Sequence, residues 1–154
     1  MIPTLPGEGR VPYTPLPRKS PAYTGKIVVP REEGIVESHR WGRFIKLLCN
    51  EITGDDTFTL GERIYDPGRS VGPIEGGPSE AIHILEGRGT LRAWLDGAPD
   101  SRPTEVPLQP GLEIIVTQNL RHVIRNEGDS PMVALVTICH ADFPAYPHHY
   151  PAIF

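Results

Sequence analysis

Glu80-Ala-Ile-His-Ile-Leu-Glu-Gly-Arg-Gly89 decides the fold, because it reads as a β-strand that ends in a glycine-rich turn. Side chains along a strand alternate between two faces of the sheet. Glu80, Ile82 and Ile84 therefore share one face, and His83 lies on the opposite one. The strand carries a carboxylate on the same face as two isoleucines.

A second strand is predicted toward the end of the segment that runs from Gly111 to Asn126. In Arg121-His-Val-Ile-Arg125 the two arginines share one face, and His122 and Ile124 share the other. Arginine side chains are mostly exposed, so the arginine face is expected to meet water. His122 is therefore predicted to face the interior together with Ile124.

Short apolar runs of this kind recur at intervals of about ten residues, and turn residues close each of them. With 18 Pro and 16 Gly among 154 residues, the chain is interrupted too often for a bundle of long helices. The predicted fold class is all-β, a sandwich or a barrel. The predicted strands are Arg43–Cys49, Phe58–Tyr65, Glu80–Leu85, Thr90–Leu95, Glu105–Leu108, Leu112–Thr117, Arg121–Asn126 and Val133–Cys139.

The first thirty residues differ from the rest, since they hold seven prolines and show no strand or helix period. We expect residues 1–30 to form an extended Pro-rich arm and residues 31–154 to form one barrel domain with an aromatic C-terminal tail. The two cysteines, Cys49 and Cys139, are too few for a disulfide framework and are expected to be buried free thiols.

Charge and hydropathy limit the partners. The net charge is −4, without a basic block that would neutralise a phosphate backbone, so nucleic acid is not an expected partner. No run approaches the roughly 18 apolar residues of a membrane span, and the first residues lack the features of a signal peptide. The expected setting is cytoplasmic, with no membrane partner.

The two opening stretches resemble the paired motifs of the cupin superfamily, small jelly-roll barrels of two antiparallel sheets with a ligand site in the mouth. In the second motif Gly111, His122 and Asn126 are identical to the family pattern, while Thr117 and Asn119 replace its Pro and Gly. The resemblance covers residues 43–140. It implies a cupin-type jelly-roll β-barrel behind the extended N-terminal arm.

The first cupin motif is less complete. Glu80 and Gly87 keep its final spacing, but its two histidines are absent, and Glu75 stands in one of the candidate registers. The family holds a divalent metal such as Fe, Mn, Ni, Cu or Zn with three imidazoles and one carboxylate. The resemblance therefore implies either no metal or one weakly bound by Glu80 and His122, with Glu75 as a further oxygen donor.

The resemblance also places the strand 58–65 beside the ligand site. Either Glu62 and Ile64 or Arg63 and Tyr65 face inward, and alternation alone does not decide between the pairs. An inward Arg63 would anchor a carboxylate or an enolate, whereas an exposed ion pair is the commoner arrangement. The predicted lining of the pocket is Glu75, Arg63, Tyr65, Ile82 and Ile124.

The other histidines are weaker candidates for metal ligands. His83 would reach the site only if a bulge reversed its face. His148 and His149 lie within an aromatic, Pro-rich tail, and His140 lies just before it. Packing of this tail on the barrel is therefore favoured over a metal cluster.

Three functions remain open, and each involves a small organic molecule as partner. The preferred one is an enzyme of secondary metabolism, similar to polyketide-cyclase cupins, in which Glu80 and His122 catalyse isomerisation, dehydration or cyclisation as an acid/base pair. Burial is expected to lower the pKa of the His122 imidazole. The alternatives are a metal-dependent oxygenase or lyase, and a non-catalytic binding module.

A homodimer is also predicted. The edges of an all-β sandwich need covering, and Gly25-Lys-Ile-Val-Val29 would add a strand to an edge of its own barrel or of a partner. Prolines on both sides stiffen this segment and favour exchange between subunits. The arm, residues 1–30, is therefore expected to cross the barrel of the other subunit.

Overall fold

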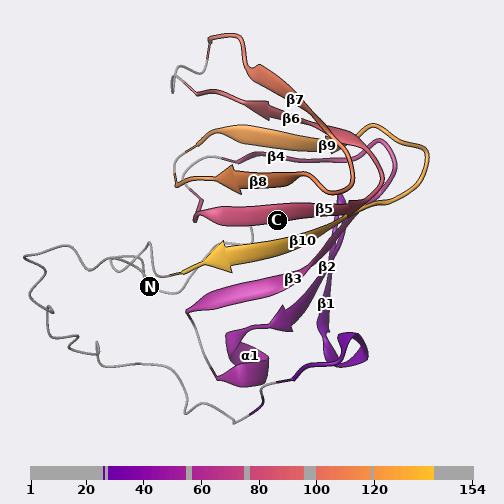
Figure 1. Cartoon of the computed structure of the whole chain (residues 1–154), viewed down its shortest axis with the longest axis vertical. Coiled ribbons are helices and arrows are strands. Elements are labelled where there is room, and N and C mark those ends of the chain that lie inside the picture. The colour runs from indigo at the N-terminus through magenta and orange to yellow at the C-terminus, as the bar shows by residue number, and fades with distance from the viewer. Residues whose placement is uncertain are drawn as a thin grey trace, which may run out of the picture.

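The computed structural model describes residues 26, 28–54, 57–74, 77–95, 100–118 and 120–140. Within them the chain forms ten strands in two antiparallel sheets, so the all-β prediction is confirmed. Figure 1 shows the strands stacked from β7 at the top to β1 at the bottom. They are β1 Ile35–His39, β2 Gly42–Leu48, β3 Phe58–Tyr65, β4 Ser70–Ile74, β5 Glu80–Glu86, β6 Gly89–Ala93, β7 Thr104–Leu108, β8 Glu113–Val116, β9 His122–Asn126 and β10 Met132–Cys139.

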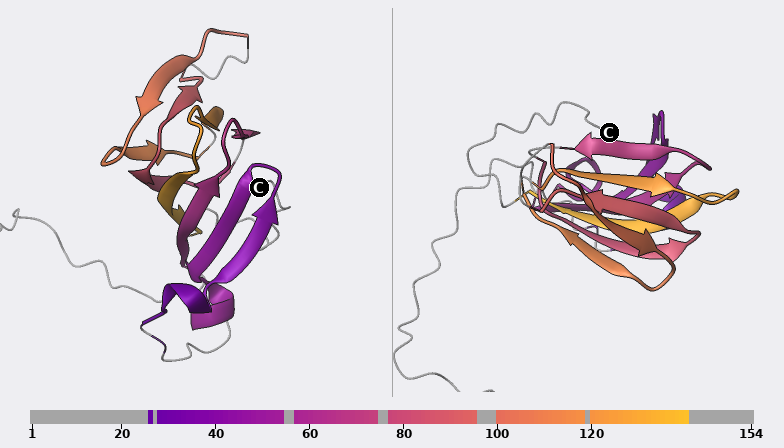
Figure 2. Two further views of the ribbon diagram at one scale, coloured as in Figure 1. Left: turned by 90° about the vertical axis from the view of Figure 1, so that its right-hand side faces the viewer. Right: turned by 90° about the horizontal axis from the view of Figure 1, so that it is seen from above.

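The strand order of the two sheets is that of a jelly roll, with neighbours in space drawn from distant parts of the chain. The six-stranded sheet has the order β1-β2-β3-β10-β5-β8, and the four-stranded sheet has the order β4-β9-β6-β7. Figure 2 shows the four-stranded sheet nearest the viewer in its right-hand view. The last strand, β10, thus lies between β3 and β5 at the centre of the larger sheet.

Eight strands lie where the sequence predicted them, within two residues at each end. The sequence missed β1 and β4, which both lie at sheet edges. β4 contains Gly72 and Pro73, residues that signal turns rather than strands, and an edge strand tolerates a proline because one side needs no hydrogen bonds.

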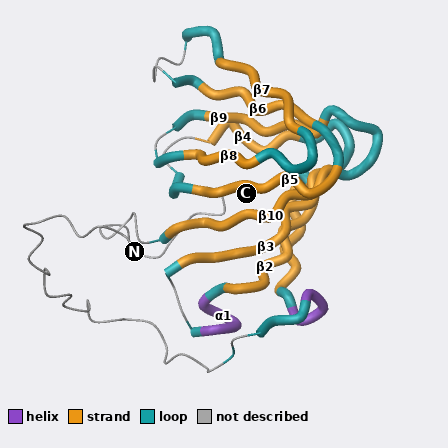
Figure 3. Tube along the Cα trace, in the orientation of Figure 1, coloured by secondary structure: helices purple, strands orange, loops and turns teal. Residues whose placement is uncertain are grey.

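Helix is confined, among the described residues, to two short segments at the base of the molecule, η1 Arg31–Glu33 and α1 Asn50–Thr53 (Figure 3). Lys26 forms an ion pair with Glu33. Of the arm segment predicted to add a strand, residues 26, 28 and 29 lie in no strand of this chain. Apart from Pro30, the rest of the arm lies outside the described residues, as does the aromatic tail beyond His140.

The core lies between the inner faces of the two sheets, where side chains alternate as the sequence predicted. On β9, His122 and Ile124 are buried while Arg125 is exposed. On β5, Ile82 and Ile84 are buried. Cys49 is buried as predicted, but Cys139 is half-buried, because the alternation of β10 puts it on the partly exposed outer face.

Two motif glycines occupy turns that require a left-handed backbone. Gly87 has φ +83° and Gly111 has φ +86°, a region that other residues rarely adopt. A Cβ on Gly87 would also lie 2.7 Å from the Cα of Met132. The family pattern has glycine at these two positions because the turn after β5 and the turn before β8 need this backbone conformation.

Asn126 joins the two sheets at the end of the barrel near Tyr65. Its amide nitrogen donates to the carbonyl oxygens of Tyr65 and Ser130, both at 2.9 Å, and its oxygen accepts from the Gly128 amide at 2.8 Å. Asn126 is completely buried, and its amide links the Tyr65 carbonyl on β3 to the turn that contains Gly128 and Ser130.

Asn126→Ala is therefore expected to lower the free energy of unfolding by about 2 kcal/mol, because it removes three hydrogen bonds, of which the one to the Tyr65 carbonyl is buried. Urea denaturation measures the change. Arg125→Ala, on the exposed face of the same strand, is the matched control and should change stability by about 0.5 kcal/mol at most. Equal losses in the two variants would contradict a structural role for Asn126.

Candidate functional site

A buried ion pair dominates the polar part of the core. Arg63 on β3 donates from both terminal nitrogens to the two carboxylate oxygens of Glu80 on β5, each at 2.8 Å. The side chains are 1% and 3% exposed. β3 and β5 are separated by β10, on which the residue directly opposite Arg63 is Ala134.

The alternation of β3 is therefore settled. Arg63 and Tyr65 face the interior, whereas Glu62 faces outward and accepts hydrogen bonds from Arg31 Nε at 2.8 and 3.0 Å. The sequence did not decide which face of this strand points inward, because each face carries one charged residue and one less polar residue: Glu62 with Ile64, or Arg63 with Tyr65.

Arg63 has a second contact, with an aromatic ring. Its guanidinium carbon lies 5.6 Å from the ring centroid of Phe44, the residue opposite it on β2. Burial alone would lower the pKa of Arg63, but the negative charge of Glu80 more than offsets this and raises it. Burial raises the pKa of Tyr65, against the effect of the neighbouring Arg63 charge. The site therefore holds a charged guanidinium beside an un-ionised phenol.

His122 enters the same interior from the opposite sheet. It is 3% exposed, and its Nδ1 lies 2.8 Å from the Leu120 carbonyl oxygen, so Nδ1 carries the proton and donates it. Burial lowers the pKa of His122; the Leu120 carbonyl and Glu80 oppose this effect, and Arg63 adds to it. The predicted lowering of the His122 pKa is thus present, and it favours the neutral imidazole with its lone pair on Nε2.

The Nε2 atom of His122 is buried and has no hydrogen-bond partner among the described residues. Glu80 and Arg63 are buried on strands of the six-stranded sheet, and His122 is buried on a strand of the four-stranded sheet. Ile82 and Ile124, each 1% exposed, belong to the surrounding core. A pocket lined by these side chains stays a prediction.

Only two of the predicted metal donors, Glu80 and His122, lie among the described residues. Both oxygens of Glu80 bind Arg63, and His83 lies on the outer face, 3.3 Å from Glu113. Glu75 lies outside the described residues. Across the part of the chain that is described, no three His, Cys, Asp or Glu side chains form a group that could hold a metal ion. The donors present at Glu80 and His122 thus do not fit the divalent metal that the family pattern implies.

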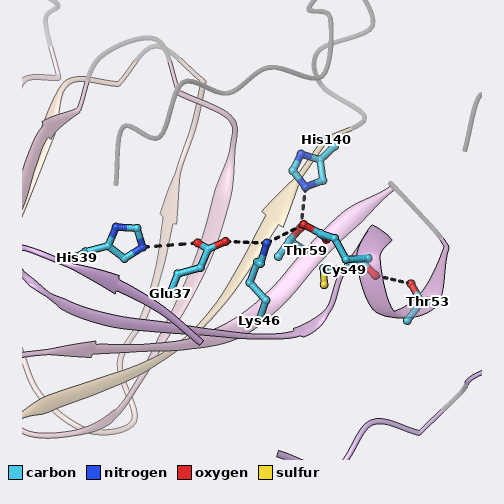
Figure 4. Close-up of polar contacts among 8 residues, drawn as sticks. Glu37, His39, Lys46, Cys49, Thr53, Thr59 and His140 are labelled. Atoms are coloured by element: carbon cyan, nitrogen blue, oxygen red, sulfur yellow. Dashed lines mark hydrogen bonds and ion pairs between the residues drawn. The ribbon is translucent and has the colours of Figure 1, made fainter. Parts of the chain in front are cut away.

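A second polar cluster lies outside this site, on β1, β2 and α1 (Figure 4). Lys46 binds Glu37 and Glu51, both at 2.8 Å. Although burial raises the pKa of Glu51, Lys46 and a backbone amide lower it to about 2. His140 lies 2.9 Å from the Thr59 hydroxyl, so it pairs within the fold, while His148 and His149 lie outside the described residues.

Among the described residues, no helix is long and apolar enough to cross a membrane.

Comparison with known proteins identifies the fold. No protein-family profile matches the chain, and no curated protein matches its sequence. Solved structures do match, beginning with the capsular polysaccharide assembling protein CapF from Staphylococcus aureus, at a TM-score of 0.58 and 18% identity over 70% of this chain. The match spans only 29% of CapF.

Two further structures extend the comparison. The cupin domain of Schizosaccharomyces pombe Cnp3 has a TM-score of 0.51 and 16% identity, over 63% of this chain and 59% of that one. Fe(II)-HppE, with the alternative substrate (S)-1-HPP, has a TM-score of 0.58 and 14% identity, over 74% and 60%. The chain therefore has the cupin fold. Identities this low show the fold alone, so function must be argued from the site.

The buried imidazole predicts a pH dependence of stability. Because its pKa is lower in the folded chain than in the unfolded one, the unfolded chain binds a proton first as the pH falls. The His122 contribution to stability is thus complete above about pH 6.5, the unfolded pKa, and is lost below it.

Urea denaturation at pH 7.5, 6.5 and 5.5 measures this effect, with His122→Gln as the control. The wild-type protein should lose more stability than the variant over this range, by up to about 1.4 kcal/mol per pH unit between the two pKa values. Parallel curves for the two proteins would show that His122 is protonated to the same extent in both states.

Proposed function

We propose that this chain is a small-molecule enzyme that performs acid/base chemistry inside the cupin barrel. The reaction class is isomerisation, dehydration or cyclisation of a polyketide-like substrate in secondary metabolism. One observation carries the proposal: the buried Nε2 atom of His122 has a lone pair and no partner among the described residues. Buried polar atoms are almost always paired, so this atom is suited to a ligand that donates a proton.

The roles follow from the charges around His122. Nε2 removes a proton from a carbon next to a substrate carbonyl, and the electron pair of the broken C–H bond stays on the substrate as an enolate. The positive charge of Arg63 stabilises the enolate oxygen. The imidazolium then returns the proton to another atom of the substrate, which completes an isomerisation without an added co-reactant.

Glu80 has a different role from the one that the sequence suggested. Its two oxygens are engaged by Arg63, so it is a positioning residue rather than half of an acid/base pair. It holds the guanidinium in place and balances its charge in a low-dielectric interior. The catalytic group is then His122 alone.

Deuterium exchange tests the proposal without knowledge of the natural substrate. The full chain, treated with EDTA, is mixed with 2-tetralone, 1-indanone or ethyl acetoacetate in D2O, and NMR follows exchange at the carbons next to the carbonyl. Exchange of at least one probe should exceed that in buffer containing free imidazole at the same concentration. Exchange at the imidazole rate for all three probes contradicts proton abstraction in the barrel.

A non-catalytic binding module is the second candidate, and the engagement of Glu80 by Arg63 favours it over a two-group acid/base site. In this case 2-tetralone would shift the NMR resonances of His122 without any exchange of its protons. The donors at Glu80 and His122 do not favour the metal-dependent oxygenase or lyase, since they do not fit a divalent metal.

The homodimer is a further part of the proposal. Light scattering on the full chain should give twice the monomer mass at micromolar concentration. A chain that starts at Arg31 lacks the arm and should dissociate or melt at a lower temperature, because a sheet edge of the partner loses its cover. A monomeric full chain refutes the dimer, and a shortened dimer of unchanged melting temperature refutes the role of the arm.

A further inference from the structure

We propose that Arg63 is a built-in cation that closes the metal position of this barrel, so that Glu80 and His122 do not bind a divalent metal while Arg63 is present. Removal of the guanidinium is then expected to create a metal site at these two side chains. The proposal concerns binding and holds whether or not the barrel turns over a substrate.

The first argument is the occupation of the carboxylate. A metal ion would need at least one oxygen of Glu80, and each oxygen accepts a hydrogen bond of 2.8 Å from a different nitrogen of Arg63. The pair is bidentate and almost completely buried. Such a fork of two parallel hydrogen bonds is both strong and geometrically specific.

The second argument is charge. A divalent cation that approached Glu80 would lie next to the guanidinium in a region of low dielectric, where repulsion between like charges is strong. One positive charge already balances the one carboxylate of the site.

The third argument is that the guanidinium is fixed where it lies. It lies over the Phe44 ring on the neighbouring strand β2 and is bound to both oxygens of Glu80. A swing away from Glu80 would leave two buried charges unpaired, which is far costlier than the loss of a surface contact. A metal ion therefore has no low-energy route to displace Arg63.

Removal of Arg63 would leave a carboxylate and a neutral imidazole facing one region. His122 is already in the state that a metal requires, with Nδ1 bound to a backbone carbonyl and the lone pair on Nε2. Glu80 would lack any counter-charge, and a divalent cation would supply one. Water molecules would complete the coordination.

The test is a titration of the full, EDTA-treated chain with Co²⁺, followed by visible absorption and by calorimetry. Arg63→Met should bind Co²⁺ at least about tenfold more tightly than the wild-type protein, because the repulsive charge is gone and Glu80 is free. Arg63→Lys keeps a cation and should bind as weakly as wild type. Arg63→Met/His122→Ala should lose the gain.

Each outcome decides the proposal. The proposal would be overturned if the wild-type protein bound Co²⁺ as tightly as Arg63→Met does and if His122→Ala abolished that binding. A folded Arg63→Met chain without tighter binding would overturn it as well. If Arg63→Met is unfolded without metal, its circular dichroism is recorded with Co²⁺. Recovery of the strand signal in Arg63→Met, but not in Arg63→Met/His122→Ala, supports the proposal. The absence of recovery in Arg63→Met contradicts it.

Discussion

Arg63→Met is expected to lower the free energy of unfolding by about 3–5 kcal/mol, the largest loss of stability among the substitutions considered. The physical reason lies in Glu80, which is 3% exposed and whose oxygens both depend on Arg63. The variant leaves a buried carboxylate without a counter-charge. The chain must then protonate Glu80, admit water or unfold.

Two controls separate the ion pair from its surroundings. Arg63→Met/Glu80→Leu removes both charges and should recover most of the lost stability, because an apolar pair of similar volume often replaces a buried ion pair at no net cost. Arg92→Met breaks an exposed pair with Glu105, whose side chains are 53% and 56% exposed, and should cost about 1 kcal/mol at most.

Urea denaturation followed by circular dichroism gives the free energies. A loss for Arg63→Met no larger than that for Arg92→Met would show that the buried pair is not formed. If the double variant is no more stable than Arg63→Met, the cost arises from lost packing around Arg63, such as its contact with Phe44, and not from the charge left on Glu80.

The strands were predictable wherever alternation was strong and turns were marked. β3 lies at Phe58–Tyr65, the predicted bounds, because Asp55-Asp56 and Asp66-Pro67-Gly68 delimit it. β4 was not predicted, because its sequence, Ser70-Val-Gly-Pro-Ile74, is typical of a turn. Its pairing with β9 along a sheet edge overrides that local signal.

The site was predictable in part. The flanking arginines fixed the face of His122, and the family registers pointed to Glu80. The partner of Glu80 was not predictable, because Arg63 is brought beside it by β10, a strand that follows both in sequence. No spacing rule connects residues that become neighbours through a third strand. The remaining signal was physical: a buried carboxylate needs a cation, and Arg63 was one of the inward candidates.

The largest expected effect on activity comes from His122. His122→Ala should lower the rate of deuterium exchange by about 10²–10⁴-fold, the usual contribution of a positioned general base. Its effect on the overall fold should be small by comparison, because the fold loses one hydrogen bond, from Nδ1 to the Leu120 carbonyl. The measurement is the exchange rate of whichever probe the wild-type protein turns over.

Two further comparisons distinguish a base from a structural residue. His83→Ala removes an imidazole from the outer face of β5 and should leave the exchange rate unchanged. Added imidazole should restore part of the rate in His122→Ala but not in wild type, because the variant retains Arg63 and Glu80 and lacks only the group that accepts the proton. A folded His122→Ala chain that exchanges the probe at the wild-type rate would exclude His122 as the base.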